Sequence, residues 1–316
     1  MLQDGTYAEY MCRTETKRQI GRPDLQADAS IILDSYQLTL SPMTLEDIPK
    51  LHELSIGVNW PHRPHDWALL IQLGNGYVAR DEIGRVAGSA MWFPMGSHRA
   101  SVAMVITSPR FQDHGAGSWL MGHILRETGS REKILNATKA AYRLYISLGF
   151  TPLKTVFQQN GVAVRVPDAP DTATPMRAEH RDEIVRLDAN AYGADRGHIF
   201  ERLFQVSQGT VIERGGRLVG FALCREFGRG RQMGPVVAET EEDAIALIHP
   251  FVKEYKDTFL RMDTRATDGP LRTYLTEAGI VLYDTVTTMT RDFAGAAAFI
   301  EKDGPITFGL VNQALG

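Results

Sequence analysis

The stretch Pro109-Arg110-Phe111-Gln112-Asp113-His114-Gly115-Ala116-Gly117-Ser118 decides how the rest of the chain is interpreted. It follows an apolar segment that ends at Thr107 and precedes a helical pattern over about 115–128, so it connects a strand to a helix. The first N–H groups of a helix lack partners within the helix and carry partial positive charge, which suits a phosphate. Gly115 and Gly117 have no Cβ, so a ligand can approach the backbone closely. The stretch therefore predicts a phosphate-binding loop.

Two other phosphate loops are excluded by the residues that follow. A P-loop needs Gly-Lys-Ser/Thr, which is absent. The dinucleotide fingerprint GxGxxG needs a third glycine in the region where this chain has Trp119 and Leu120. The pattern Gly-x-Gly has low specificity by itself, so a plain glycine-rich turn is the alternative interpretation.

Periodicity predicts the elements of the first half around this loop. Strands are expected at 36–40, 76–81, 85–93, 101–107, 133–136, 150–158 and 162–166, and helices at 44–54, 64–73, 115–128 and 139–148. Thr44, with Asp47 three residues later, should cap the first helix. This order predicts a mixed α/β (α+β) fold, with a central and largely antiparallel sheet flanked by helices.

The second half of the chain repeats short segments of the first half at a nearly constant offset. The matching segments are 41–43 with 174–176, 76–79 with 209–212, and 85–90 with 217–222. Three matches in the same order indicate an internal repeat. Residues 1–35 are polar and unpatterned, and 167–175 are rich in proline and acidic residues. We therefore expect an N-terminal extension (1–35), a first domain (36–166), a linker (167–175) and a second domain (176–316).

The composition of the 316 residues excludes several classes of protein. The net charge is −4 and no segment is strongly basic, so nucleic acid is not an expected partner. No apolar stretch approaches the roughly 20 residues that span a bilayer, and the N-terminus lacks the pattern of a signal peptide. Cys12 and Cys224 form no CxxC motif, which fits a reducing compartment. We expect a cytoplasmic protein that acts on small molecules without a metal ion or a membrane, and homodimer formation stays open.

Two motifs together resemble the GNAT superfamily of acyl-CoA-dependent N-acetyltransferases. The motif (Gln/Arg)-x-x-Gly-x-(Gly/Ala) after a strand is matched by Gln112, Gly115 and Gly117. The later motif Leu-Tyr-x-x-x-Gly-Phe is matched by Leu144–Phe150. The resemblance covers residues 36–166 well, and the layout of the whole chain is similar to the YitH-type tandem-GNAT architecture.

The resemblance implies that acetyl-CoA, or a related short acyl-CoA, is the acyl donor. Strand residues Val105, Ile106 and Thr107 would pair with the pantetheine arm. The pyrophosphate would bind the backbone amides of Gln112, Asp113, His114, Gly115, Ala116, Gly117 and Ser118. Tyr145 would be the general acid that protonates the departing thiolate, which suits a phenol with an ordinary pKa of about 10; a core aromatic is the alternative. Thr138 stands where many members carry Asn, which puts one contact with the cofactor in doubt.

The second half lacks both motifs. Its strand over 232–237 runs into Ala238-Glu239-Thr240-Glu241-Glu242-Asp243, which has no glycine and carries four carboxylates that would repel a pyrophosphate. Leu275 stands where Tyr145 stands in the first half. We therefore expect a degenerate GNAT-like domain that binds no CoA and either lines the acceptor site or forms a dimer contact.

The acceptor site is less clearly marked. Many family members place a glutamate on the strand before the loop, whereas Ser101–Ile106 has none. His98 is one candidate for the general base, and the segment Trp60–His65 or a chain of waters are others. The candidates for acceptor binding are Trp60, His62, Trp92, Asp195 and Arg196. The last two would hold the amine and the carboxylate of an amino-acid-like acceptor. The alternatives are core packing for Trp92, a surface position for the histidines, and a helix cap with a solvated arginine for the last pair.

The pattern predicts an N-acyltransferase that transfers acetyl from acetyl-CoA to a primary amine of a small molecule, amino-acid-like or polyamine-like. Neither cysteine is placed for a covalent intermediate, so direct attack in a ternary complex is expected. Two other functions stay open. The missing strand carboxylate suggests a non-catalytic module that senses acyl-CoA, and the acceptor could instead be a lysine or the N-terminus of a protein.

Overall fold

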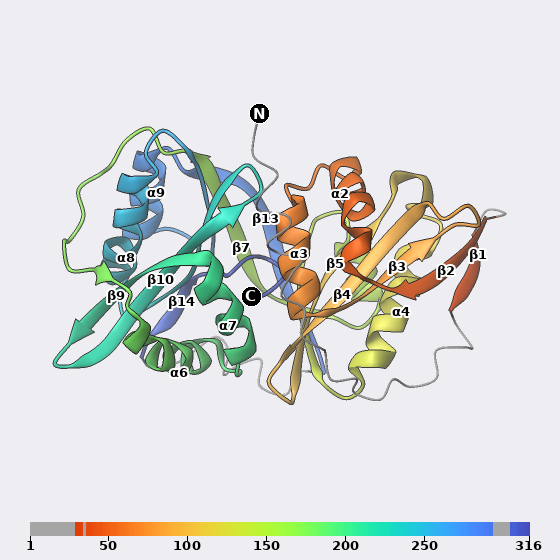
Figure 1. Ribbon diagram of the computed structural model, residues 1–316, viewed down its shortest axis with the longest axis horizontal. Helices are drawn as coiled ribbons and strands as arrows, with labels where there is room; N and C mark the ends of the chain where they lie inside the picture. The colour runs from red at the N-terminus through yellow and green to blue at the C-terminus, as the bar shows by residue number, and fades with distance from the viewer. Residues whose placement is uncertain (1–28, 34–35, 293–303) are drawn as a thin grey trace.

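The computed structural model describes residues 29–33, 36–292 and 304–316 (Figure 1). Most of the expected N-terminal extension, including Cys12, lies outside the described residues. Its last part includes a strand that the unpatterned sequence did not predict, because Ser30–Leu33 form β1, antiparallel to β2 (Tyr36–Pro42). The alternating exposure of β1 is typical of an edge strand.

In the described part of the chain, fourteen strands form one sheet that runs through both halves. Its order is β1-β2-β3-β4-β5-β6-β13-β7-β12-β14-β11-β10-β9-β8. The first half adds β3 (Asn75–Arg80), β4 (Val86–Met95), β5 (Arg99–Thr107), β6 (Glu132–Ala137) and β7 (Thr151–Val162). The second half adds β8 (Thr174–Pro175), β9 (Ser207–Arg214), β10 (Arg217–Phe227), β11 (Gly230–Ala238), β12 (Phe259–Thr264), β13 (Val281–Arg291) and β14 (Ile306–Gly309). Among the described strands, only β5–β6 and β11–β12 pair in parallel, which confirms the mixed, largely antiparallel sheet.

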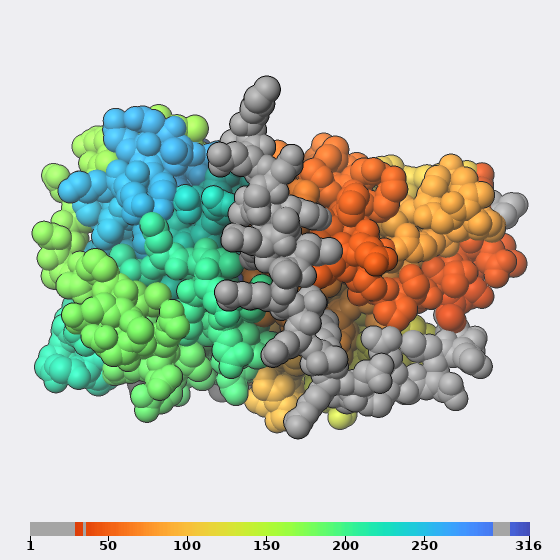
Figure 2. Space-filling model, viewed as in Figure 1, coloured from red at the N-terminus to blue at the C-terminus, as the bar shows by residue number. Residues whose placement is uncertain are grey.

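Helices cover both faces of the sheet. One face carries α2 (Ile48–Gly57), α3 (Pro64–Leu73), α6 (Arg181–Tyr192) and α7 (Gly197–Val206), and their apolar side chains share a single core with residues of both halves. We call this the shared face. The other face carries α4 (Ala116–Thr128) and α5 (Tyr142–Ser147) in the first half, and α8 (Glu241–Glu254) and α9 (Pro270–Ala278) in the second, each pair over its own core. Figure 2 shows the halves on opposite sides of the molecule, red to orange and green to blue.

The two halves exchange strands at the centre of the sheet. Strand β13 lies between β6 and β7, and β7 in turn pairs with β12 of the second half (Figure 1). The expectation of two strands at 150–158 and 162–166 was therefore wrong. One long strand covers 151–162, and residues 163–173 form neither helix nor strand. The position beside β6 that a second local strand would fill is taken by β13.

Local signals predicted most other elements of the first half. Thr44 and Asp47 form the expected capping box before α2, and α3 has the expected bounds. Helix α5 is shorter than the expected 139–148, because Thr138 first forms a separate turn in which its carbonyl accepts the N–H of Ala141.

Candidate active site

Strands β5 and β6 separate partway along their length. They pair from Arg99–Glu132 to Ser101–Ile134, and beyond Ser101 each continues without pairing with the other. Among the described residues, no strand lies between them. The resulting gap exposes backbone groups at two strand edges, and such edges can pair with an extended ligand.

A bulge in β5 borders this gap. Ser89 pairs with Ile106 and Met91 with Ala103, so Met104 and Val105 together face the single residue between them on β4. Met104 has φ of 53°, which is uncommon for a residue with a side chain and costs about 1–3 kcal/mol. The Ser89 hydroxyl stabilises it by donating to the carbonyl of Met104 at 2.8 Å. The bulge removes backbone polar groups of β5 from the β4–β5 ladder.

The sequence held a signal for this bulge that the periodicity did not reveal. Gly88 interrupts β4, and a Cβ there would lie 2.7 Å from the carbonyl oxygen of Ile106. A glycine inside a strand often marks a bulge or a close approach of two backbones.

The loop at the end of β5 leaves the N-terminus of α4 without a side-chain cap. Gly115 caps the helix with φ of 91°, and Asp113 before it has φ of 63°. The side-chain amide of Gln112 donates to the Thr107 carbonyl at 3.1 Å and ties the loop to its strand. The first N–H groups of α4, from Ala116 onward, have no side-chain cap, so a helix dipole and free donors coincide there.

Glycine at position 117 also brings α5 close to this helix end. A Cβ on Gly117 would lie 3.1 Å from a Leu144 methyl group, so any side chain would push against α5. The predicted cofactor-binding residues lie at the end of β5, in the loop after it and in the first turn of α4. Thr138 is the exception and lies in the connection between β6 and α5. Ile106 and Ala116 are buried, Val105, Thr107, Gly117 and Thr138 are half-buried, and Gln112, Asp113, His114, Gly115 and Ser118 are exposed. The uncapped helix end and the glycine-lined approach fit the pyrophosphate and the arm of an acyl-CoA.

Tyr145 lies on α5 beside this loop. Its side chain is buried, and its ring packs edge-on against Phe150 with centroids 5.8 Å apart. Burial raises the pKa of Tyr145 above its ordinary value, so the phenol keeps its proton throughout the neutral range. The side chain therefore carries a proton at neutral pH, which the predicted role of general acid requires.

The two histidines proposed for the acceptor side differ in environment. His98 is exposed in the turn between β4 and β5, and its carbonyl accepts the N–H of Glu132 where the two parallel strands begin to pair. His62 packs against Trp60, Trp67 and Phe227. Burial, together with Arg261 and Arg225, lowers the pKa of His62 to about 3. His62 is therefore neutral and a weak base at neutral pH.

The two tryptophans lie in different places. Trp60 is half-buried in the connection between α2 and α3, on the shared face. Trp92 belongs to the core beneath α4, and its indole N–H donates to Glu127 at 2.9 Å. These contacts favour the core-packing interpretation of Trp92.

Asp195 and Arg196 also have intramolecular roles. Asp195 is exposed and accepts the N–H of Gly197 at 2.8 Å, from one residue before Arg196, which is the N-cap of α7. Arg196, in contrast to a solvated arginine, is fully buried. It forms two hydrogen bonds with Asp188, at 2.9 and 2.6 Å, and two with the carbonyls of Leu315 and Gly316. The expectation that Arg196 binds the acceptor's carboxylate is therefore wrong, because its guanidinium is buried and bonded to Asp188 and the end of the chain.

The second half contains a corresponding gap, and its own chain fills it. Strands β11 and β12 pair in parallel only at Arg231–Leu260 and Gln232–Arg261. Beyond this point β14 lies between them, antiparallel to both. The helix that follows, α8, is capped by Thr240, whose hydroxyl accepts the N–H of Asp243. The acidic groups there are engaged as well, since Asp243 pairs with Arg214, and Glu239 pairs with Arg214 and Arg217.

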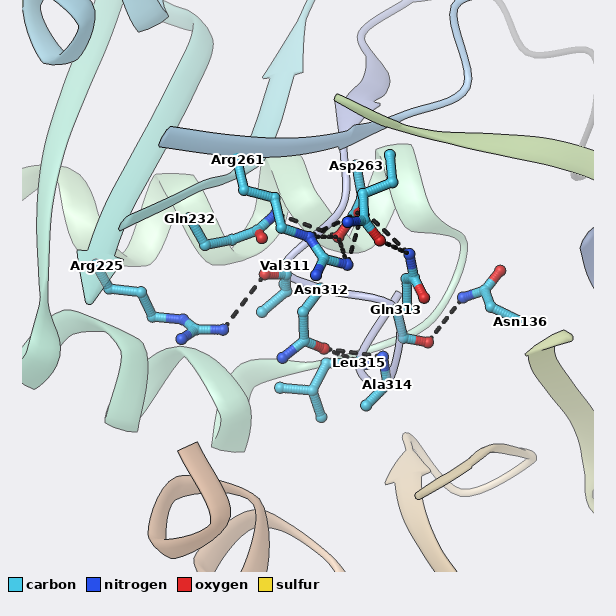
Figure 3. A network of polar contacts seen from close by, with 11 residues as sticks. Asn136, Arg225, Gln232, Arg261, Asp263, Val311, Asn312, Gln313, Ala314 and Leu315 are labelled. Carbon is cyan, nitrogen blue, oxygen red and sulfur yellow. Dashed lines mark hydrogen bonds and ion pairs between the residues drawn. The ribbon is translucent and has the colours of Figure 1, made fainter. Parts of the chain in front are cut away.

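After β14 the chain continues as a buried tail, residues 310–316, which crosses to the first half (Figure 3). Ser101 donates to the Ala314 carbonyl at 2.7 Å, and the Asn136 amide donates to the Gln313 carbonyl at 2.8 Å. Ser101 is the last residue of β5 that pairs with β6, and Asn136 lies two residues beyond its partner Ile134 on β6. The tail therefore meets the first half where its gap begins. No sequence pattern pointed to this contact.

Comparison with known proteins agrees with this architecture. Models of the acetyltransferase (GNAT) domain match residues 72–152 and, separately, 184–297. The chain is 23% identical over 292 residues to the uncharacterized N-acetyltransferase YitH of Bacillus subtilis, covering 86% of this chain and 99% of YitH. It is 24% identical over 230 residues to the holothin acyltransferase of a Pseudoalteromonas species, covering 66% and 74%. A putative acetyltransferase from Pyrococcus horikoshii has a similar fold, with a TM-score of 0.71 at 16% identity over 88% of this chain and 96% of that one.

The described residues contain neither a helix that could span a membrane nor a cluster of metal-ligating side chains. None of their helices combines the length and the apolar character needed to cross a membrane. They also contain no group of three or more His, Cys, Asp or Glu side chains arranged to hold a metal ion.

Proposed function

From the premise that the chain belongs to the GNAT acetyltransferase family, as an N-acyltransferase with two such domains in tandem, we propose that its first domain acylates a primary amine of a small molecule. The donor is acetyl-CoA or a related short acyl-CoA. The observation that carries the proposal is the uncapped start of α4, with Gly115 and Gly117, beside the helix that bears Tyr145.

The chain's own residues divide the work of the reaction. The first N–H groups of α4 bind the pyrophosphate charge, and the free edge of β5 beyond Ser101 aligns the extended arm. When bound, acyl-CoA supplies the thioester carbonyl that an amine can attack. As the amine nitrogen bonds to the acyl carbon and the C–S bond breaks, Tyr145 donates its Oη proton to the sulfur, and the proton lost by the nitrogen passes through water to the Tyr145 phenolate. The bulge at Met104 offers backbone N–H groups to an oxygen that gains negative charge.

The second domain binds no acyl-CoA in this proposal, so one donor binds per chain. Strand β14 lies in the gap that the arm would need, and Thr240 with four nearby carboxylates replaces the open helix end. These features support the expectation of a degenerate second domain. Its helices α6 and α7 share one apolar core with α2 and α3 of the first domain.

A small-molecule acceptor is supported by the holothin acyltransferase, a relative whose name gives holothin as its substrate. The deciding experiment measures thiol release from acetyl-CoA with a panel of lysine, putrescine and phenethylamine, and with a lysine-containing peptide. Release with a small amine supports the proposal. Release with the peptide alone indicates a protein acceptor, and acyl-CoA binding without release in any reaction indicates a sensing module.

A further inference from the structure

The tail of the second half contacts both strands that border the gap, since Ala314 accepts from Ser101 on β5 and Gln313 accepts from Asn136 on β6. The Asn312 side chain accepts the N–H groups of Ala314 and Leu315 at 2.9 Å and folds the tail into a turn. Arg196 binds the last two carbonyls, at 2.8 and 2.7 Å. A segment held at both its turn and its end keeps a fixed position beside the gap.

One side chain of this segment stands out. Every residue from Phe308 to Gly316 is buried except Gln313, which is half-buried. Its backbone carbonyl accepts from Asn136, so the residue lies beside the beginning of the gap. Its side-chain nitrogen donates to Asp263 at 3.2 Å and to Gln158 at 3.3 Å.

These contacts fix the orientation of the Gln313 amide. The carboxylate of Asp263, paired with Arg261 at 3.0 Å, can only accept hydrogen bonds, so the amide nitrogen must face it. The oxygen Oε1 then points away from Asp263, on the same side of Gln313 as Asn136 (Figure 3). None of the described residues donates a hydrogen bond to this oxygen.

We propose that the tail forms one wall of the acceptor site of the first domain, and that Gln313 is a positioning residue whose Oε1 accepts an N–H of the incoming amine. The inference rests on the proposed acyl transfer. The Gln313 amide is held through its nitrogen by two hydrogen bonds, and its neutral carbonyl oxygen can orient a primary amine without trapping it as an ion pair, because the charge on that oxygen is only partial. In this arrangement the second half supplies a residue that the first domain needs in order to select its acceptor.

The test uses Gln313→Met in the full-length protein. Methionine has a similar length and keeps the backbone bond to Asn136, but it cannot accept the amine's hydrogen bond. With the best amine of the panel above and saturating acetyl-CoA, the acceptor KM should rise about tenfold or more, as expected for losing one hydrogen bond to a charged or highly polar group. The dissociation constant of acetyl-CoA, measured by calorimetry, should stay within twofold. Gln37→Met, an exposed glutamine on β2, is the matched control and should change neither value.

The outcomes separate this inference from the function it rests on. An acceptor KM within twofold of wild type overturns the role of Gln313, even if the melting temperature falls. A parallel rise in the acetyl-CoA dissociation constant also overturns it, because the variant would then disturb the whole gap. If the wild-type protein releases no thiol with any amine, the proposed function fails instead.

Discussion

The side-chain amide of Asn136 on β6 donates to the backbone carbonyl of Gln313, 2.8 Å away in space and 177 residues further along the chain. This hydrogen bond connects a strand that borders the gap between β5 and β6 with the tail after β14, the strand that fills the gap between β11 and β12. The two halves therefore differ in more than sequence motifs. In the first half no described strand lies between β5 and β6. In the second half β14 lies between β11 and β12 and continues into the tail that contacts the first half.

Gly117→Glu should abolish binding of acetyl-CoA. The new Cβ would meet Leu144 at 3.1 Å, and the carboxylate would stand at the helix end where the pyrophosphate needs positive potential. Calorimetric titration measures the effect. Gly122→Glu, one turn further along α4, adds the same charge where a Cβ has more room, and it should retain binding. Unchanged affinity in Gly117→Glu would refute the assignment of the loop.

Tyr145→Phe should lower kcat by about 100-fold or more, the lower range for losing a general acid, with little change in acetyl-CoA affinity. The phenyl ring keeps the packing against Phe150, so the fold should be preserved. A kcat close to that of wild type would exclude the role as general acid.

The pH profile provides a second check on Tyr145. A general acid works while it is protonated, so its activity is lost as the pH rises through its pKa. Because burial raises that pKa, wild-type kcat should show no loss from this group up to at least pH about 10. A decline near pH 8 that disappears in Tyr145→Phe would contradict the assigned environment.

Arg196→Met should destabilise the protein by about 3–5 kcal/mol, because it leaves the Asp188 carboxylate buried without its partner. It also removes the donors that hold Leu315 and Gly316. Urea denaturation measures the loss in free energy of unfolding. The double variant Asp188→Leu, Arg196→Met should recover part of it, whereas a loss under 1 kcal/mol in the single variant would show that the pair is not buried in solution.

His62 should make the fold sensitive to acid. Its pKa of about 3 lies below the unfolded value of 6.5, so the unfolded state binds its proton first and stability falls as the pH drops below 6.5. The loss attributable to this group is up to about 2 kcal/mol at pH 5. His62→Phe should flatten the dependence of the unfolding free energy between pH 6.5 and 5, and an equally steep dependence in the variant would contradict the lowered pKa.

The features that sequence predicted best are those set by neighbouring residues. The loop at 109–118, the cap at Thr44 and the helix over 64–73 depend on local hydrogen bonds and periodicity, and the structure has them as expected. The placement of β13 between β6 and β7 could not be predicted in this way. It is a pairing between distant strands, and their alternation does not specify which partner each strand takes.

Contacts between distant residues also limited the prediction of the acceptor-binding residues. Arg196 has the chemistry of a carboxylate ligand, but its partners are Asp188 and the end of the chain, which only the fold brings to it. Gln313 carried no motif, and its position beside Asn136 results from the path of the tail across the sheet. The bulge at Met104 was not predicted, but the sequence contains a signal for it, since Gly88 on the facing strand marks the close approach of the two backbones.

The most direct test of acyl transfer by the first domain is to quantify free CoA thiol and acylated amine in the same reaction, for wild type and for Gly117→Glu. Wild type should form the two products in equal amounts with at least one small amine, and Gly117→Glu should form neither. Acetyl-CoA binding by wild type without either product, or full activity in Gly117→Glu, would contradict the proposal.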